Sequence, residues 1–228
     1  MKKIKVCALA LCISTALFAQ TNDTKIEKEV FAGLSMNGFT GSDADNLDMK
    51  TGFHVGVTAR YYLYESFFLE GSLGLATKGY KSGSFETSGQ YWLDDDANYD
   101  RSISRKYTSY NIDLPILAGY KLSVNDDLNI KIKVGPYLTY AVSGKEKVSG
   151  KDVYFPDIHS SETLYINEET KIGDMDGFKN FGYGIHASVS ADYKQFVLSA
   201  SYQHGFSKVF DKAKAYEQNI LISLGYRF

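Results

Sequence analysis

The last eleven residues of the chain, Gln218 to Phe228, alternate between polar and apolar side chains and end in an aromatic residue. One parity holds Ile220, Ile222, Leu224, Tyr226 and Phe228. Successive side chains of a β-strand point to opposite faces, so these apolar residues share one face. Such a strand with a terminal aromatic residue is typical of the closing strand of a bacterial outer-membrane β-barrel, whose outer face meets lipid. The pattern predicts a chain that enters a membrane through strands.

Seven other segments have the same two-residue period and the length of about ten residues that crosses a bilayer as a tilted strand. In chain order the expected strands cover 29–39, 52–63, 67–78, 107–121, 128–142, 181–193, 196–203 and 218–228. The first strand is the least regular, because Phe31 and Phe39 oppose the apolar parity of Val30 and Leu34, and a β-bulge could shift its register. The predicted fold is all-β, an eight-stranded antiparallel up-and-down transmembrane β-barrel.

The connections between these strands alternate in length. Residues 64–66, 123–127 and 194–195 are short connections, whereas 40–51, 81–106, 143–180 and 207–217 are long ones. Outer-membrane barrels have short periplasmic turns and long extracellular loops. A soluble lipocalin-like barrel, the structural alternative, has no reason to separate its loops this way. Aromatic residues near both ends of the expected strands also match the two bilayer interfaces.

The N-terminus resembles a secretory leader. A basic start is followed by an apolar core and by Ala19-Gln20, so we expect a cleaved signal peptide over 1–19, a short periplasmic segment over 20–28 and the barrel over 29–228. Both cysteines, Cys7 and Cys12, fall in the leader, which leaves the mature chain without a thiol. The net charge of −2 becomes more negative without the leader lysines, and an acidic exported chain is a poor candidate for nucleic-acid binding.

Two internal strands contain proline within otherwise regular patterns. The segments IDLPILAGYKL (112–122) and IKVGPYLTYAVSGK (132–145), with the terminal LGYRF, resemble the PorT-like outer-membrane β-barrel proteins. The resemblance implies an outer-membrane barrel of the porin family, a link to protein secretion through the member that gave the group its name, and no catalytic residues or cofactor. Pro115 and Pro136 lack the N–H that a sheet uses, so each should mark a bulge or a local break.

Charged residues occur on the polar parity of the expected strands. The eight are Arg60, Glu70, Lys78, Asp113, Lys131, Lys133, Asp192 and Arg227. An eight-stranded barrel has an interior just wide enough for side chains to fill, so these charges should neutralise one another inside. Five are basic and three acidic, which predicts a slightly cationic lumen. If 64–66 forms the turn, Arg60 lies opposite Glu70, and we predict an ion pair between them.

The long connections are the expected place for contacts with other molecules. The stretch from Gly89 to Asp100 combines aromatic and acidic side chains, namely Tyr91, Trp92, Asp94, Asp95 and Asp96. On an exposed loop this mixture suits a protein, glycan or lipid-headgroup partner, although the same residues could simply cap the barrel mouth. The expected partners are outer-membrane lipid and lipopolysaccharide, and an envelope or extracellular protein. The barrel-assembly machinery is a further expected partner, through Tyr226 and Phe228.

Three functions are compatible with this pattern. The first is a structural or interaction barrel that uses its long extracellular loops or assists an envelope complex, and the second is a narrow passive pore. The third, an enzyme, is disfavoured: His186 shares a strand face with Ser188, Ser190 and Asp192, but residues two and four apart lie roughly 7 and 13 Å from one another. No cofactor or metal is expected, because the acidic stretch GDMDG lacks the further ligands of a calcium loop.

Overall fold

The computed structural model describes residues 25–44, 47–83, 85–90, 98–157 and 160–228. Its strands are β1 (Ile26–Thr40), β2 (Leu47–Tyr62), β3 (Phe67–Lys78), β4 (Tyr80–Ser82), β5 (Phe85–Gln90), β6 (Asn98–Ser123), β7 (Leu128–Asp157), β8 (Ser160–Lys171), β9 (Phe181–Tyr193), β10 (Phe196–Lys208) and β11 (Tyr216–Arg227), with a single helical turn η1 (Ile172–Asp174). Among the described residues, no helix is long and apolar enough to cross a membrane.

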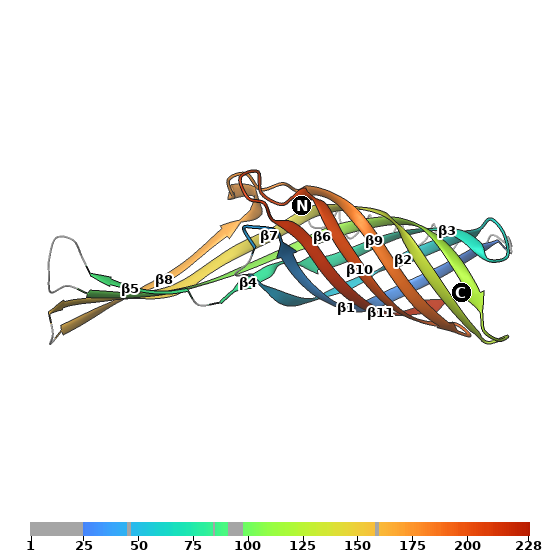
Figure 1. Ribbon diagram of the computed structural model, residues 1–228, viewed down its shortest axis with the longest axis horizontal. Helices are drawn as coiled ribbons and strands as arrows, with labels where there is room; N and C mark the ends of the chain where they lie inside the picture. Colours follow the sequence, from blue (N-terminus) through green and yellow to red (C-terminus); the bar gives the residue numbers. More distant parts are fainter. Residues whose placement is uncertain (1–24, 45–46, 84, 91–97, 158–159) are drawn as a thin grey trace, which may run out of the picture.

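Eight of these strands close into a barrel (Figure 1). Antiparallel pairing runs through β1, β2, β3, β6, β7, β9, β10 and β11, and β11 pairs with β1 to complete the ring. The predicted up-and-down barrel is therefore confirmed. We call the end with the first residue of β1, the last residue of β11 and the connections 63–66, 124–127 and 194–195 the short-turn end, and the opposite one the arm end.

The first strand pairs in unbroken register with both neighbours, so the suspected bulge in it is absent. Its odd residues face inward, and this includes Phe31, whose ring lies 5.8 Å from that of His54. Two glycines make room for this ring: a Cβ on Gly56 would lie 2.6 Å from Phe31 Cζ, and one on Gly74 would lie 3.5 Å from it. The large Phe31 ring therefore fits inside the barrel because the residues beside it are glycines.

The outward parity forms a continuous apolar surface. Leu34, Ile222 and Leu224 are 57% to 66% exposed. The expected aromatic residues also point outward, and they are Tyr61, Phe67, Tyr120, Tyr193, Phe196, Tyr226 and Phe228 near the short-turn end, with Phe53, Tyr110, Tyr140, Phe181, Tyr183 and Tyr202 toward the arm end. This arrangement matches an apolar band between two aromatic girdles, as in membrane barrels.

Pro115 interrupts the ladder on both sides without shifting the register. Pairing with β3 stops between Ile116 and Asp113 and then resumes unchanged. Pairing with β7 stops between Pro115 and Ala118 and also resumes in the same register. Pro136 keeps its place opposite Ile185 of β9. The predicted break is therefore present near the prolines, whereas the β6–β7 bulge lies elsewhere, between Tyr110 and Asn111.

Strands β6 and β7 contain 26 and 30 residues and continue well past the barrel. Beyond the barrel β6 also pairs with β5, and β7 also pairs with β8, which gives a four-stranded extension that we call the arm (Figure 1). The long connections expected over 81–106 and 143–180 are therefore largely strands. Polar residues occupy both faces of the arm, so the apolar period that predicts a membrane strand is missing there.

Buried aromatic rings close the barrel at the arm end. Tyr80 stacks on Tyr107 with ring centroids 5.6 Å apart, and Phe39 approaches Tyr80 to 5.2 Å. Phe178 covers Tyr107 at 5.9 Å, and Ile172 of η1 belongs to the same buried cluster. The barrel mouth is thus capped by residues of β1, β4, β6 and the β8–β9 connection.

Candidate functional site

The barrel interior near the short-turn end is organised around Arg60, which is 1% exposed. Its guanidinium donates to Glu70 Oε2 at 2.6 and 2.8 Å, to Glu27 Oε2 at 2.7 Å and to Glu29 Oε2 at 3.2 Å. Lys133 Nζ contacts the other oxygen of Glu70 at 2.8 Å. The predicted register and the predicted ion pair between Arg60 and Glu70 are both present. One arginine therefore ties together strands β1, β2 and β3.

A second basic group extends this network to the strands that close the ring. Lys131 Nζ lies 2.6 Å from Asp192 Oδ2 and 3.0 Å from Glu27 Oε2, and neither Lys131 nor Asp192 is exposed. Arg227 Nη1 reaches the same Asp192 at 3.3 Å and Glu27 at 3.5 Å. Phe68 packs beneath the Arg60 guanidinium, 5.3 Å from its ring centroid. We call these four basic and four acidic residues, with Arg60 at their centre, the terminal charge cluster.

A smaller group of charges lies nearer the arm end. Lys78 Nζ contacts Asp113 Oδ1 at 3.1 Å and Glu217 Oε2 at 2.8 Å, and it donates to Thr139 Oγ1 at 3.0 Å. Its ammonium also lies 5.1 Å from the ring centroid of Tyr137. Every residue in this group faces the interior, and its single cation is matched by two carboxylates.

The interior charge balance differs from the expected one. Glu27, Glu29 and Glu217 join the three predicted acidic residues, so five basic residues face six acidic ones and the lumen is not cationic. Glu27 was missed because β1 begins at Ile26 rather than at residue 29. Glu217 was missed because β11 begins two residues earlier than expected. The parity of β1 could have revealed Glu29, which shares the inward face with Phe31.

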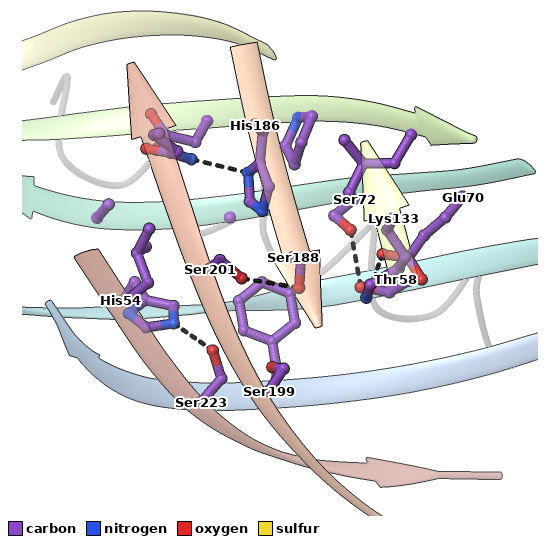
Figure 2. A pocket seen from close by; sticks show the side chains of 18 of the residues that line it. His54, Thr58, Glu70, Ser72, Lys133, His186, Ser188, Ser199, Ser201 and Ser223 are labelled. Carbon is purple, nitrogen blue, oxygen red and sulfur yellow. Dashed lines mark hydrogen bonds and ion pairs between the residues drawn. The ribbon is translucent and has the colours of Figure 1, made fainter. Parts of the chain in front are cut away.

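A cavity of about 70 Å³ is lined by members of both groups of charges, among them Glu70, Lys133 and Asp113. Figure 2 shows polar side chains that line it. His54 Nε2 lies 2.6 Å from Ser223 Oγ, and Ser201 Oγ donates to Ser188 Oγ at 2.9 Å. His186 Nδ1 lies 3.2 Å from the side-chain nitrogen Nε2 of Gln203. Such a volume holds a few water molecules, whereas pockets for organic ligands measure about 300 Å³ or more. The cavity is suited to buried water.

The arrangement of these polar residues does not form a catalytic triad. In the described part of the chain, His186 makes no hydrogen bond to a serine or a carboxylate, and Ser190 donates weakly to Asp192 at 3.3 Å. His54 and Ser223 do form a close pair, but the Nδ1 of His54 has no acidic partner to orient it. The orienting group that activates a serine through histidine is therefore missing.

The predicted contact residues of the long connection, Tyr91, Trp92, Asp94, Asp95 and Asp96, lie outside the described residues. Elsewhere on the arm, Arg101 donates two hydrogen bonds of 2.7 Å to Asp152, and these bonds lower the pKa of the Asp152 carboxyl. A hydrogen bond from Lys145 lowers the pKa of Glu169 in the same way. Among the described residues, no group of three or more His, Cys, Asp or Glu is placed to hold a metal ion.

The terminal aromatic residues lie on the outer surface at the short-turn end. Tyr226 is 39% exposed and Phe228 is 62% exposed, with their rings edge to face at 5.3 Å. The backbone N–H of Phe228 donates to the carbonyl of Lys28 at 3.0 Å. Phe196 packs against Tyr226 at 5.7 Å. These residues therefore extend the lipid-facing girdle next to the seam between β1 and β11.

Replacing Arg60 with methionine should lower the free energy of unfolding by about 3–5 kcal/mol, because buried carboxylates lose their shared partner. The matched control is Arg101→Met, which removes an exposed ion pair and should cost less than about 1 kcal/mol. Urea unfolding of the refolded protein in lipid vesicles, followed by the heat-modifiable shift on a gel, measures both. Equal losses for the two variants would contradict the central role of Arg60.

Comparison with known proteins gives a family and a set of structural neighbours. A search of curated proteins finds no match. The attachment invasion locus protein Ail of Yersinia pestis is similar, with 16% identity, 90% of this chain and 100% of Ail covered, and a TM-score of 0.39. Neisserial surface protein A is 14% identical over 88% of this chain and 97% of its own, with a TM-score of 0.40. The family model described as "Outer membrane protein beta-barrel domain" matches residues 18–211, so the chain belongs to this family of outer-membrane β-barrels.

Proposed function

We propose that this outer-membrane barrel is a surface interaction protein whose barrel anchors the arm and whose arm contacts a partner protein. The observation that carries the proposal is the arm itself, a four-stranded sheet that continues beyond the barrel on strands β6 and β7 (Figure 1). Two long strands that stay paired from the barrel into the arm, with one bulge between Tyr110 and Asn111, make a stiff support. A stiff projecting sheet is suited to recognition.

The edges of the arm offer main-chain hydrogen-bonding groups. Within the described residues, β5 pairs with β6 only and β8 pairs with β7 only, so each has one unpaired edge. Unpaired strand edges accept an added strand from another chain, and side chains on alternate positions then give specificity. The arm therefore presents two sites at which an extended peptide could bind.

One face of the arm also carries apolar side chains. Ile103 and Ile166 lie on either side of Gly150 in one cross-strand row. Leu164, two residues from Ile166 and on the same face, is 67% exposed. An exposed apolar patch beside a free strand edge favours a protein partner over a small polar solute. The alternative expectation, that the aromatic and acidic residues of 89–100 only cap the mouth, is disfavoured because Tyr80, Tyr107 and Phe178 already do so.

The orientation and export of the chain are part of this proposal. We infer that 1–19 is a cleaved signal peptide, that 20–28 lies in the periplasm, and that the short-turn end faces the periplasm while the arm is extracellular. Support comes from the separation of short and long connections between the two barrel ends. The proline-containing strands further support a place among the PorT-like, porin-family barrels, and hence a role near an envelope or secretion complex.

Site-specific cross-linking tests the arm as the contact surface. Because the only cysteines lie in the proposed leader, a thiol can be placed uniquely. Tyr165→Cys introduces it on β8, where the native side chain is 79% exposed, and Leu198→Cys places it on the lipid face of β10 as the control. We expect a photoactivatable thiol reagent to trap a protein adduct on intact cells only from position 165. An adduct from both positions, or from neither, would count against the proposal.

The pore alternative is disfavoured by the filled interior. The terminal charge cluster blocks one end, the aromatic cap blocks the other, and the cavity between them measures about 70 Å³. We therefore expect planar bilayers that contain the refolded protein to show no discrete conductance steps. Reproducible steps that disappear on heat denaturation would instead support a passive pore.

We also propose that Tyr226 and Phe228 form the signal by which the barrel-assembly machinery recognises the terminal strand. Their exposure beside the β1–β11 seam supports this role. Deleting Phe228 should reduce the amount of heat-modifiable protein in the outer membrane severalfold, without the same loss during refolding in detergent. The matched control is Phe196→Ala, which removes the neighbouring girdle ring and leaves the terminus intact. Normal assembly after the deletion would contradict the proposal.

A further inference from the structure

Five lysines gather on the outer surface where the arm leaves the barrel. They are Lys81 of β4, Lys106 of β6, Lys145 and Lys147 of β7, and Lys171 of β8, and we call them the basic belt. Directly opposed partners in a sheet share a face, and the pairing places Lys81 opposite Lys106 and Lys106 opposite Lys147. Lys145 is likewise opposite Lys171. All five side chains are exposed.

This arrangement opposes the stability of the sheet, because like charges directly across a strand pair repel each other. Glu169 partly compensates, with its Oε2 at 2.9 Å from Lys145 Nζ and 3.4 Å from Lys147 Nζ. In the described part of the chain, no carboxylate oxygen lies within 4.0 Å of the ammonium of Lys81, Lys106 or Lys171. Asp48 is opposite Lys81 in the register but forms no such pair. The belt therefore has an excess of positive charge that the described residues do not balance.

A sixth lysine, Lys50, is affected by the positive charge of the belt. Lys50 Nζ donates to the carbonyl of Tyr107 at 3.3 Å and to the hydroxyl of Thr108. Burial lowers the pKa of Lys50 to about 8, and repulsion by Lys106 and Lys81 adds to the effect. Lys50 therefore lies close enough to Lys106 and Lys81 for their charges to act on it.

The height of the belt above the membrane is set by the strands that carry it. Lys106 lies four residues beyond Tyr110 on the same outward face of β6, and Tyr110 belongs to the arm-end girdle. Four residues span about 13 Å along a strand, or about 10 Å along the membrane normal for a strand tilted by about 40°. Girdle aromatics lie at the headgroup level, so the belt is at the outer margin of the headgroup layer.

We propose that the basic belt binds the phosphate groups of lipopolysaccharide in the outer leaflet around the barrel. The proposal rests on the orientation given above, in which the arm end faces outward. Charge complementarity supports the proposal, because ammonium groups near a membrane surface attract anionic headgroups. Each basic residue contributes a similar free energy to the binding. Such binding also gives the opposed lysines their missing counter-charge. The bound lipid would then brace the base of the arm where β6 and β7 leave the barrel.

The test compares two triple variants of the refolded protein in detergent. The belt variant is Lys81→Gln, Lys106→Gln and Lys147→Gln, and the control is Lys179→Gln, Lys212→Gln and Lys214→Gln, which removes equal charge from exposed positions outside the belt. The probes are purified lipopolysaccharide and the same material after enzymatic removal of its phosphates. The readouts are the lipid retained by the affinity-captured protein and the shift in unfolding temperature that the lipid causes.

Intact lipopolysaccharide should raise the unfolding temperature of the unaltered protein and of the control, whereas the dephosphorylated material should not. The belt variant should bind intact lipopolysaccharide about 100-fold more weakly and retain correspondingly less of it, since three charge contacts are lost. Without lipid it should unfold at the same temperature as the unaltered protein or a higher one, because like-charge repulsion is relieved. An unfolding temperature that is unchanged or raised separates lost binding from misfolding.

Retention of intact lipopolysaccharide by the belt variant at the level of the control would overturn the proposal. Equal retention of the dephosphorylated lipid by the unaltered protein would do so as well, and so would tighter binding of a soluble sulfated glycan than of lipopolysaccharide in competition. The protein-partner proposal is tested separately by cross-linking at position 165, so either idea can fail while the other stands.

Discussion

Pairing of β11 with β1 is the contact on which the rest of the structure depends. Lipid offers no hydrogen bonds to a backbone, so a membrane sheet must close and satisfy every N–H and C=O internally. The seam runs in unbroken register from Glu29 opposite Arg227 to Thr40 opposite Tyr216. Because the ring is closed there, the apolar parity of all eight strands faces outward and the polar parity is forced inward. Both the girdles and the charged interior follow from this closure.

A closed ring of eight strands leaves an interior that side chains fill. The polar parity supplies charges to that interior, and a buried charge is tolerated only with a partner. Arg60 meets this requirement by contacting three carboxylates on β1 and β3, while Lys131 and Arg227 share Asp192 across the later strands. The charges therefore stabilise one register among the strands and at the same time obstruct the lumen. Because the interior is filled, contacts with other molecules are expected on the outer surfaces of the barrel and on the arm.

Outside the bilayer the constraint changes, because water can satisfy a strand edge. There β6 and β7 continue as a sheet whose outer strands β5 and β8 each keep one free edge. The bulge between Tyr110 and Asn111 lies near the level at which the arm departs. Above it the apolar outward parity is replaced by lysines, so one surface passes from a lipid-facing band to a cationic belt. The proposed contacts of the belt with lipid and of the arm with a partner protein therefore both lie at the arm end.

The sequence by itself determined the barrel, the strand faces and the Arg60–Glu70 pairing, because a two-residue period and a short turn fix register locally. Of the predicted interior charges, all eight take part in ion pairs. Only the tertiary structure showed that Glu27 and Glu217 complete the networks, since Glu27 contacts Lys131 and Glu217 contacts Lys78, on strands far apart in sequence. It also decided that the long connections become an arm. The polar strands of the arm are stabilised by pairing with neighbouring strands rather than by burial of an apolar face. Such strands have no alternation of apolar and polar residues from which a sequence could predict them.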